Sequence, residues 1–196
     1  VTRSLSPSRP IIAHEVCHYV ALRDLDELDR KFAEADADKP WWVDELRKLV
    51  EEKGLSDDYA RMREASKRFQ MIGWKLGIEG ARRSRILGGF HFLQLSDTEK
   101  YENCNGIIDC FDDYADVDPA AFAKFNSDTA VLADLPRRTF FEREQVSIPV
   151  IASHFSPEIA GEGDFAFTLT SDDGEVSISG RLEQIDMDRR GRREIC

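Results

Sequence analysis

The chain has 196 residues, of which 41% are hydrophobic, 33% charged and 10% aromatic. This composition is typical of a folded globular protein and excludes a disordered or collagen-like chain. Acidic residues outnumber basic ones 38 to 27, and the net charge of −11 argues against direct nucleic-acid binding and against attraction to anionic lipid. Because no apolar run is long enough to span a bilayer and the N-terminus does not resemble a signal peptide, we expect a cytoplasmic protein with no membrane association.

The N-terminal half shows three segments with apolar side chains at helical spacing. The first is expected to form a helix from near Pro10, with a stripe from His14 to Phe32. The second covers residues 41–54, and the third begins at the capping residue Ser56 and ends near Gly77. Three helices joined by short links predict an antiparallel helical bundle over residues 10–77.

The pattern changes beyond the third segment, where glycines interrupt any helix and residues 90–95 favour a strand. Asp118 before Pro119 predicts a short helix, and a turn or helix is expected over residues 127–135. Strands are expected over residues 145–152, 164–170 and 175–186, the last two joined by a tight turn. We therefore predict an α+β single domain, residues 1–196, whose helical half (10–77) packs on a mainly antiparallel β-sheet in a mixed half (86–196).

The cysteines Cys17, Cys104, Cys110 and Cys196 match neither a paired zinc-binding pattern nor the dense framework of small secreted proteins. Reduced thiols are therefore expected. The alternative is a small disulfide loop between Cys104 and Cys110.

Residues 14–18 read His-Glu-Val-Cys-His in an apolar setting. This HExxH pattern resembles the active-site helix of zincin metallopeptidases, and the resemblance covers about ten residues. It implies His14 and His18 as zinc ligands and Glu15 as the general base that deprotonates a metal-bound water. On this alternative interpretation the protein is a zinc-dependent hydrolase.

A third zinc ligand is not evident. Asp24 follows at the spacing of metzincin-like enzymes but would lie to one side of an unbroken helix, and Glu45 and Glu64 lie off the apolar stripes. Thirteen residues also cannot supply the sheet that precedes the active-site helix in zincins. We therefore expect no zinc and no other cofactor, with both histidines on a core-facing stripe and shielded from water.

Residues 97–118 carry eight acidic residues and one lysine. Carboxylates crowded into one segment repel one another, so a folded segment of this kind must face either solvent or an opposing basic surface. We therefore predict that Asp109, Asp112, Asp113 and Asp116 face a basic protein partner, with Phe111 and Tyr114 as apolar anchors. The alternative is an exposed loop whose two aromatic residues only hold it against the core. The leading hypothesis is an acidic, non-enzymatic interaction protein that binds and regulates or inhibits a basic partner.

Overall fold

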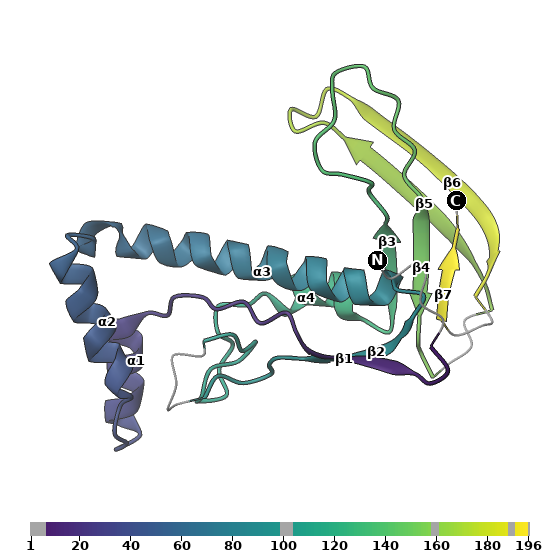
Figure 1. Ribbon diagram of the computed structural model, residues 1–196. Helices are drawn as coiled ribbons and strands as arrows, with labels where there is room; N and C mark the ends of the chain where they lie inside the picture. The colour runs from purple at the N-terminus through teal and green to yellow at the C-terminus, as the bar shows by residue number, and fades with distance from the viewer. Residues whose placement is uncertain (1–6, 99–103, 158–160, 188–190, 196) are drawn as a thin grey trace. The chain divides into compact units, whose positions relative to one another are not determined.

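The computed structural model describes residues 7–98, 104–157, 161–187 and 191–195 (Figure 1). The chain divides into two compact units, residues 1–124 and 125–196, and each is treated by itself. Helices and antiparallel sheets are both present, which confirms the α+β class. The single-domain boundary of residues 1–196 stays a prediction. Among the described helices, none combines the length and hydrophobicity that crossing a membrane requires.

The first unit carries most of the helices. In chain order its elements are β1 (Ile11–Val16), α1 (Leu25–Glu34), α2 (Trp41–Glu52), a 3₁₀ turn at Ser56–Asp58, α3 (Tyr59–Arg83) and β2 (Leu87–Phe92), while α4 (Pro119–Asn126) crosses the boundary between the units. As expected from Asp118, its carboxylate caps α4 by accepting a hydrogen bond from the amide of Ala120 at 2.9 Å.

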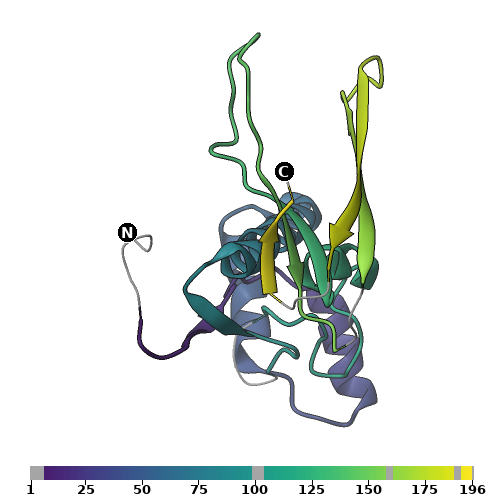
Figure 2. The same ribbon diagram turned by 90° about the vertical axis from the view of Figure 1, so that its right-hand side faces the viewer.

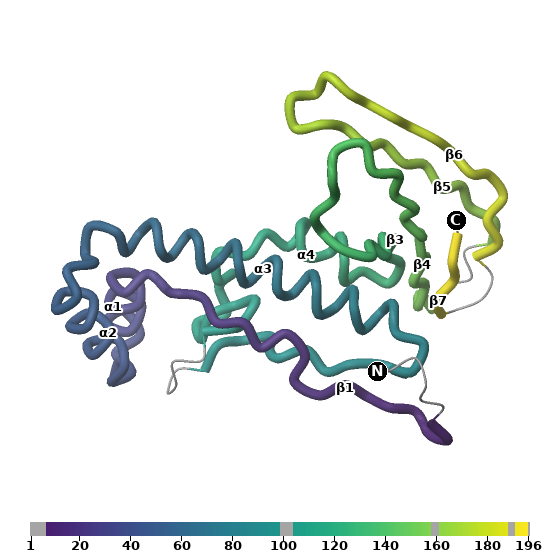
Figure 3. Tube along the Cα trace, turned by 45° about the horizontal axis from the view of Figure 1, so that its top comes forward, coloured from purple at the N-terminus to yellow at the C-terminus, as the bar shows by residue number. Residues whose placement is uncertain are grey.

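One core joins α1 and α2, which lie side by side near the start of α3 (Figures 1 and 3). Its buried members are Leu25, Leu28, Phe32, Trp42, Val43 and Cys104. A second cluster fixes the other end of α3, where Trp74, Phe92 and Phe122 meet edge-on with ring centroids 5.5–5.8 Å apart. Such aromatic pairs add specific geometry to the burial of apolar area.

The helix expected from Pro10 is wrong over its first half. Residues 11–16 form β1, which pairs in parallel with β2, and the helix begins only at Leu25. The β-branched Ile11, Ile12 and Val16 favour the strand. Asp24 then caps α1 by accepting hydrogen bonds from the amides of Asp26 and Glu27, both at 3.1 Å.

Residues 17–22, which are not helical, run antiparallel along α3 (Figure 3). Two glycines of α3 allow the close approach: a Cβ at Gly73 would lie 2.6 Å from the Tyr19 ring, and one at Gly77 would lie 2.3 Å from Cys17 Sγ. Gln70 Nε2 also donates to the carbonyl of Tyr19 at 2.6 Å. Gly77 lies within α3 at this contact and does not end the helix as predicted, and α3 continues to Arg83. The antiparallel bundle over residues 10–77 stays a prediction, and the first of its helices begins at Leu25.

The second unit holds two separate sheets. β3 (Thr129–Ala133), β4 (Val150–His154) and β7 (Gly191–Glu194) form an antiparallel sheet in the order β3-β4-β7 around buried Ala130, Leu132 and Ile151. β5 (Glu162–Thr170) and β6 (Ser177–Asp186) form a two-stranded antiparallel ribbon (Figure 2). The strands expected over 164–170 and 175–186 are confirmed, and the one expected over 145–152 is shifted to β4. The turn or helix expected over residues 127–135 is wrong, because Ala130 and Leu132 alternate with exposed neighbours as in a strand.

Candidate functional site

The HExxH residues do not form a helical metal site, because His14 and Glu15 lie in β1 and His18 follows its end. On a strand, successive side chains point to opposite faces, so the helical i, i+4 relation on which zincins depend is lost. The His14 side chain is 73% exposed, and its ring meets the ring of His91 in β2 edge-on, with centroids 5.4 Å apart. His18 is also exposed, so the expectation that both histidines are shielded from water is wrong.

Among the described residues, no third zinc ligand joins His14 and His18. Asp24 caps α1 and forms an ion pair with Arg63. Within the described residues, no group of three or more His, Cys, Asp or Glu side chains is arranged to hold a metal ion. The zinc interpretation therefore has no geometric support here, and the absence of bound zinc stays a prediction.

The six residues predicted to bind a partner all lie in one described loop, residues 109–116, which we call the acidic loop. The carboxylate of Asp109 holds the loop in shape through hydrogen bonds within the loop and a contact with α1. Its Oδ1 accepts hydrogen bonds from the amides of Phe111 (2.8 Å) and Asp113 (3.1 Å), and its Oδ2 lies 2.5 Å from Nζ of Lys31 in α1. The Asp109 side chain is only 12% exposed. Asp109 therefore organises the loop from its inner side and is largely buried, in contrast to the partner-facing position expected for it.

Lys31 lies beneath the acidic loop and forms ion pairs with two of its carboxylates. Its Nζ contacts Asp109 and, at 2.7 Å, Asp113, and its side chain is 10% exposed. Burial disfavours the ammonium, but the hydrogen bonds to these two carboxylates outweigh that effect and raise the pKa of Lys31 above its ordinary value. The same contact lowers the pKa of Asp113. Both groups therefore stay charged at neutral pH.

The two aromatic residues of the acidic loop face opposite ways. Phe111 packs edge-on against Phe32 at a centroid distance of 4.9 Å and joins the core of α1 and α2. Tyr114 is 64% exposed. Phe111 therefore holds the loop to the core, whereas Tyr114 faces solvent, and the role of Tyr114 as an anchor for a partner stays a prediction.

Three carboxylates lie on the outer side of the loop. The side chains of Asp113 and Asp116 are 66% and 52% exposed, and Asp112 is exposed as well. Asp116 forms an ion pair with Lys67 of α3, whose side chain is 12% exposed. Both lysines thus lie beneath the loop and leave its carboxylates outermost.

A buried ion pair supports the segment that precedes the loop. Arg23 and Asp97 have side chains 6% and 8% exposed and approach to 2.7 Å. Asp97 Oδ1 also accepts from the amide of Gly106 at 2.6 Å, while the Arg23 guanidinium donates to the carbonyls of Gly106 and Ala115 at 3.3 and 3.4 Å. Burial raises the pKa of Asp97, and Arg23 and the Gly106 amide offset this only in part.

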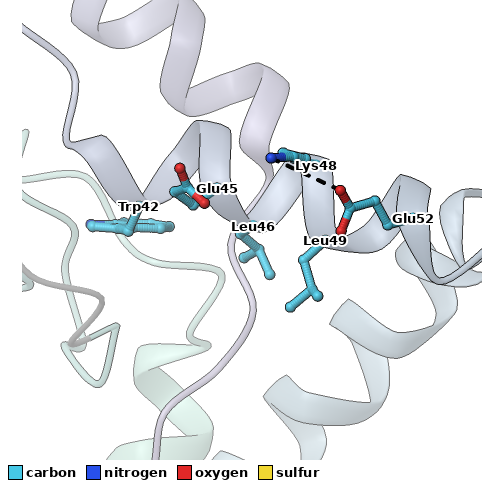
Figure 4. A pocket seen from close by; sticks show the side chains of 6 residues that line it. All are labelled: Trp42, Glu45, Leu46, Lys48, Leu49 and Glu52. Atoms are coloured by element: carbon cyan, nitrogen blue, oxygen red, sulfur yellow. Dashed lines mark ion pairs between the residues drawn. The ribbon is translucent and has the colours of Figure 1, made fainter.

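Two surface hollows of the first unit offer no comparable chemistry. One, of about 350 Å³, is lined by six residues of α2 alone, and its Lys48 and Glu52 pair with each other at 3.9 Å (Figure 4). The other, of about 380 Å³, includes Arg47 and Arg63. These already pair with carboxylates of Asp26, Asp29 and Asp24. Small-molecule sites usually have convergent polar groups around an apolar cavity, which neither hollow provides.

Comparison with family models and with curated proteins gives no match for this chain. The site therefore rests on its geometry alone. Sequence reasoning found the loop residues but missed Lys31 and Lys67, which lie in helices far away in the chain. Lys31 lies one helical turn after Glu27, and its Nζ is 3.5 Å from Glu27 Oε1. This local pairing gives no sign that Lys31 also contacts the acidic loop.

Proposed function

We propose that this chain is a non-enzymatic interaction protein that binds a basic protein partner through the acidic loop and regulates or inhibits that partner. The observation that carries the proposal is the two-sided construction of the loop. Asp109 and Phe111 are turned inward, and Tyr114 is exposed among the carboxylates of Asp112, Asp113 and Asp116.

Preorganisation favours binding because a loop that is already ordered loses little entropy when a partner docks. The hydrogen bonds to Asp109 hold the loop closed, and Asp112 and Asp116 adopt left-handed backbone angles, with φ of +65° and +60°. Aspartate tolerates this conformation better than most residues. An exposed tyrosine supplies contact area with a polar tip, which is the usual character of an interface anchor.

Charge selects a basic partner. The protein carries a net charge of −11, and exposed carboxylates around an anchor mainly increase the rate of encounter with a positive surface. Two described cysteines, Cys17 and Cys104, are buried free thiols. Free thiols suit the cytoplasm that we propose as the location.

The test compares three immobilised baits in a lysate of the native source: the wild type, a loop variant (Asp112→Lys with Tyr114→Ala) and a control (Asp172→Lys) in the turn between β5 and β6. The control makes the same charge change at another exposed aspartate. We expect a basic protein to be retained by the wild type and the control and lost with the loop variant. Equal retention by the loop variant would exclude the acidic loop as the binding surface.

A further inference from the structure

The β5–β6 ribbon has one apolar face that the described residues leave largely exposed. The strands pair so that Phe165 opposes Leu182, Phe167 opposes Gly180 and Leu169 opposes Ile178. We call the ribbon face the apolar set on this side: Phe165, Phe167, Leu169, Val176, Ile178 and Leu182. Five of its members are 38–63% exposed, while the opposite face carries small polar residues such as Thr168 and Ser179.

An isolated two-stranded ribbon is only marginally stable in water, so packing against another surface would stabilise this apolar face. The Phe167 ring already lies over Gly180, where a Cβ would meet it at 2.6 Å, and stacks on Phe165 at 6.1 Å. The rest of the face presents on the order of 450 Å² to solvent, within the range of the largest patches on ordinary monomers, which are often functional.

A second uncovered apolar surface lies on α3. Its residues follow one another at steps of three and four, which places them along one side of the helix. We call this set the α3 stripe: Met62, Ala65, Phe69, Ile72 and Leu76. Met62, Phe69 and Ile72 are 37%, 61% and 50% exposed, although Tyr19 touches the Phe69 ring edge-on.

The two surfaces have similar lengths, and the charges beside them are opposite in sign. The stripe extends about 21 Å along the helix, and the ribbon face extends about 20 Å from Val176 to Leu182. Arg61, Arg68 and Lys75 recur at seven-residue intervals beside the stripe. Residues 162–186 carry seven acidic residues and one arginine, including Asp172, Asp173 and Glu175 at the turn beside Val176.

We propose that the ribbon face of one copy of this chain packs on the α3 stripe of a second copy, and that the second copy returns the same contact to form a closed pair. Charge complementarity selects this pairing, because two ribbons or two stripes would place like charges together. A single contact would bury on the order of 800 Å², the size of a weak interface, whereas two contacts reach the ordinary size of a specific interface. Each copy then covers both surfaces of the other.

The test measures self-association of the full chain by sedimentation velocity over a range of concentrations. We expect a dimer that weakens at high salt, since the flanking charges are then screened. Ile178→Glu in the ribbon and Ile72→Glu in α3 should each weaken the dimer by roughly tenfold or more. Thr168→Glu, on the opposite face of the ribbon, should leave it unchanged. Circular dichroism checks that each variant is folded.

Mixing the two Glu variants separates this pairing from the others. A mixed pair keeps one intact contact, between the α3 stripe of the Ile178→Glu chain and the ribbon face of the Ile72→Glu chain. The mixture should therefore associate more tightly than either variant alone. A monomer at every concentration would overturn the proposal, as would a dimer that resists either variant or a mixture that shows no recovery. None of these outcomes depends on the acidic loop.

Discussion

The Arg23–Asp97 ion pair supports the acidic loop, so removing one partner tests the structure beneath the proposed site. Arg23→Met leaves the Asp97 carboxylate, 8% exposed, with the Gly106 amide as a remaining donor. Breaking a buried pair in this way costs about 3–5 kcal/mol, because the remaining charge stays buried without its counter-charge. That is a large part of the stability of an ordinary domain.

The assay is urea unfolding followed by tryptophan fluorescence. All three tryptophans, Trp41, Trp42 and Trp74, lie in the first unit, so their signal reports the unfolding of that unit. We expect the free energy of unfolding at pH 7 to fall by about 3–5 kcal/mol in the variant. A loss below about 1 kcal/mol, the value typical of an exposed pair, would refute the assignment of a buried, supporting role.

The pH dependence gives a second check of the same variant. Burial raises the pKa of Asp97 above its unfolded value of 3.8 even beside Arg23, and without Arg23 it should rise further. A carboxyl with a raised folded pKa binds its proton more tightly in the folded state, so its destabilising effect grows as pH rises through that pKa. The difference in the free energy of unfolding between the wild type and the Arg23→Met variant should therefore become smaller as the pH falls from 7 toward 4. Asp97→Asn in the Arg23→Met background should remove this dependence.

Four further substitutions test the loop and the first helix. Lys31→Met should speed hydrogen exchange at the amides of Phe111 and Asp113, because it removes the cation that fixes Asp109; unchanged protection would contradict its role in holding Asp109. Phe111→Ala should lower the free energy of unfolding in urea by about 3 kcal/mol, whereas Tyr114→Ala should change it by less than about 0.5 kcal/mol. Similar losses of stability in the two variants would contradict the opposite orientations of the two side chains. Asp24→Ala should cost about 1 kcal/mol at pH 7 as a lost helix cap. Hydrogen bonds from Glu27 and Arg63 outweigh burial and lower the folded pKa of Asp24, so this contribution is present above its unfolded pKa of 3.8 and should disappear as pH falls through the lowered folded value.

Hydrophobic spacing predicted the elements whose side chains follow one period throughout. It placed α2 and the start of α3, the strand at β2, and the ribbon with its turn at Gly174, whose φ is +75°. It failed over residues 10–24, where His14, Cys17 and Ala21 happen to repeat at helical intervals. Asp24 followed three residues later by Glu27 is a helix-start signal within that stretch, and it marks the true beginning of α1.

The sequence indicated the acidic loop as the candidate site but not which way its side chains face. The density of aspartates between residues 109 and 116 identified the loop. Which of them face inward depends on Lys31 and Lys67, and the contacts of these lysines with Asp109 and Asp116 join segments far apart in the chain. Periodicity reports only neighbours within an element, so long-range ion pairs of this kind leave no local pattern.

Binding of a basic partner at the outer side of the acidic loop is tested by the rate at which the captured partner associates with the wild type and with Asp112→Lys, measured at low and at high salt. Steering by exposed carboxylates predicts several-fold slower association of the variant at low salt and similar rates at high salt, where the charges are screened. Equal rates at low salt would contradict this proposal.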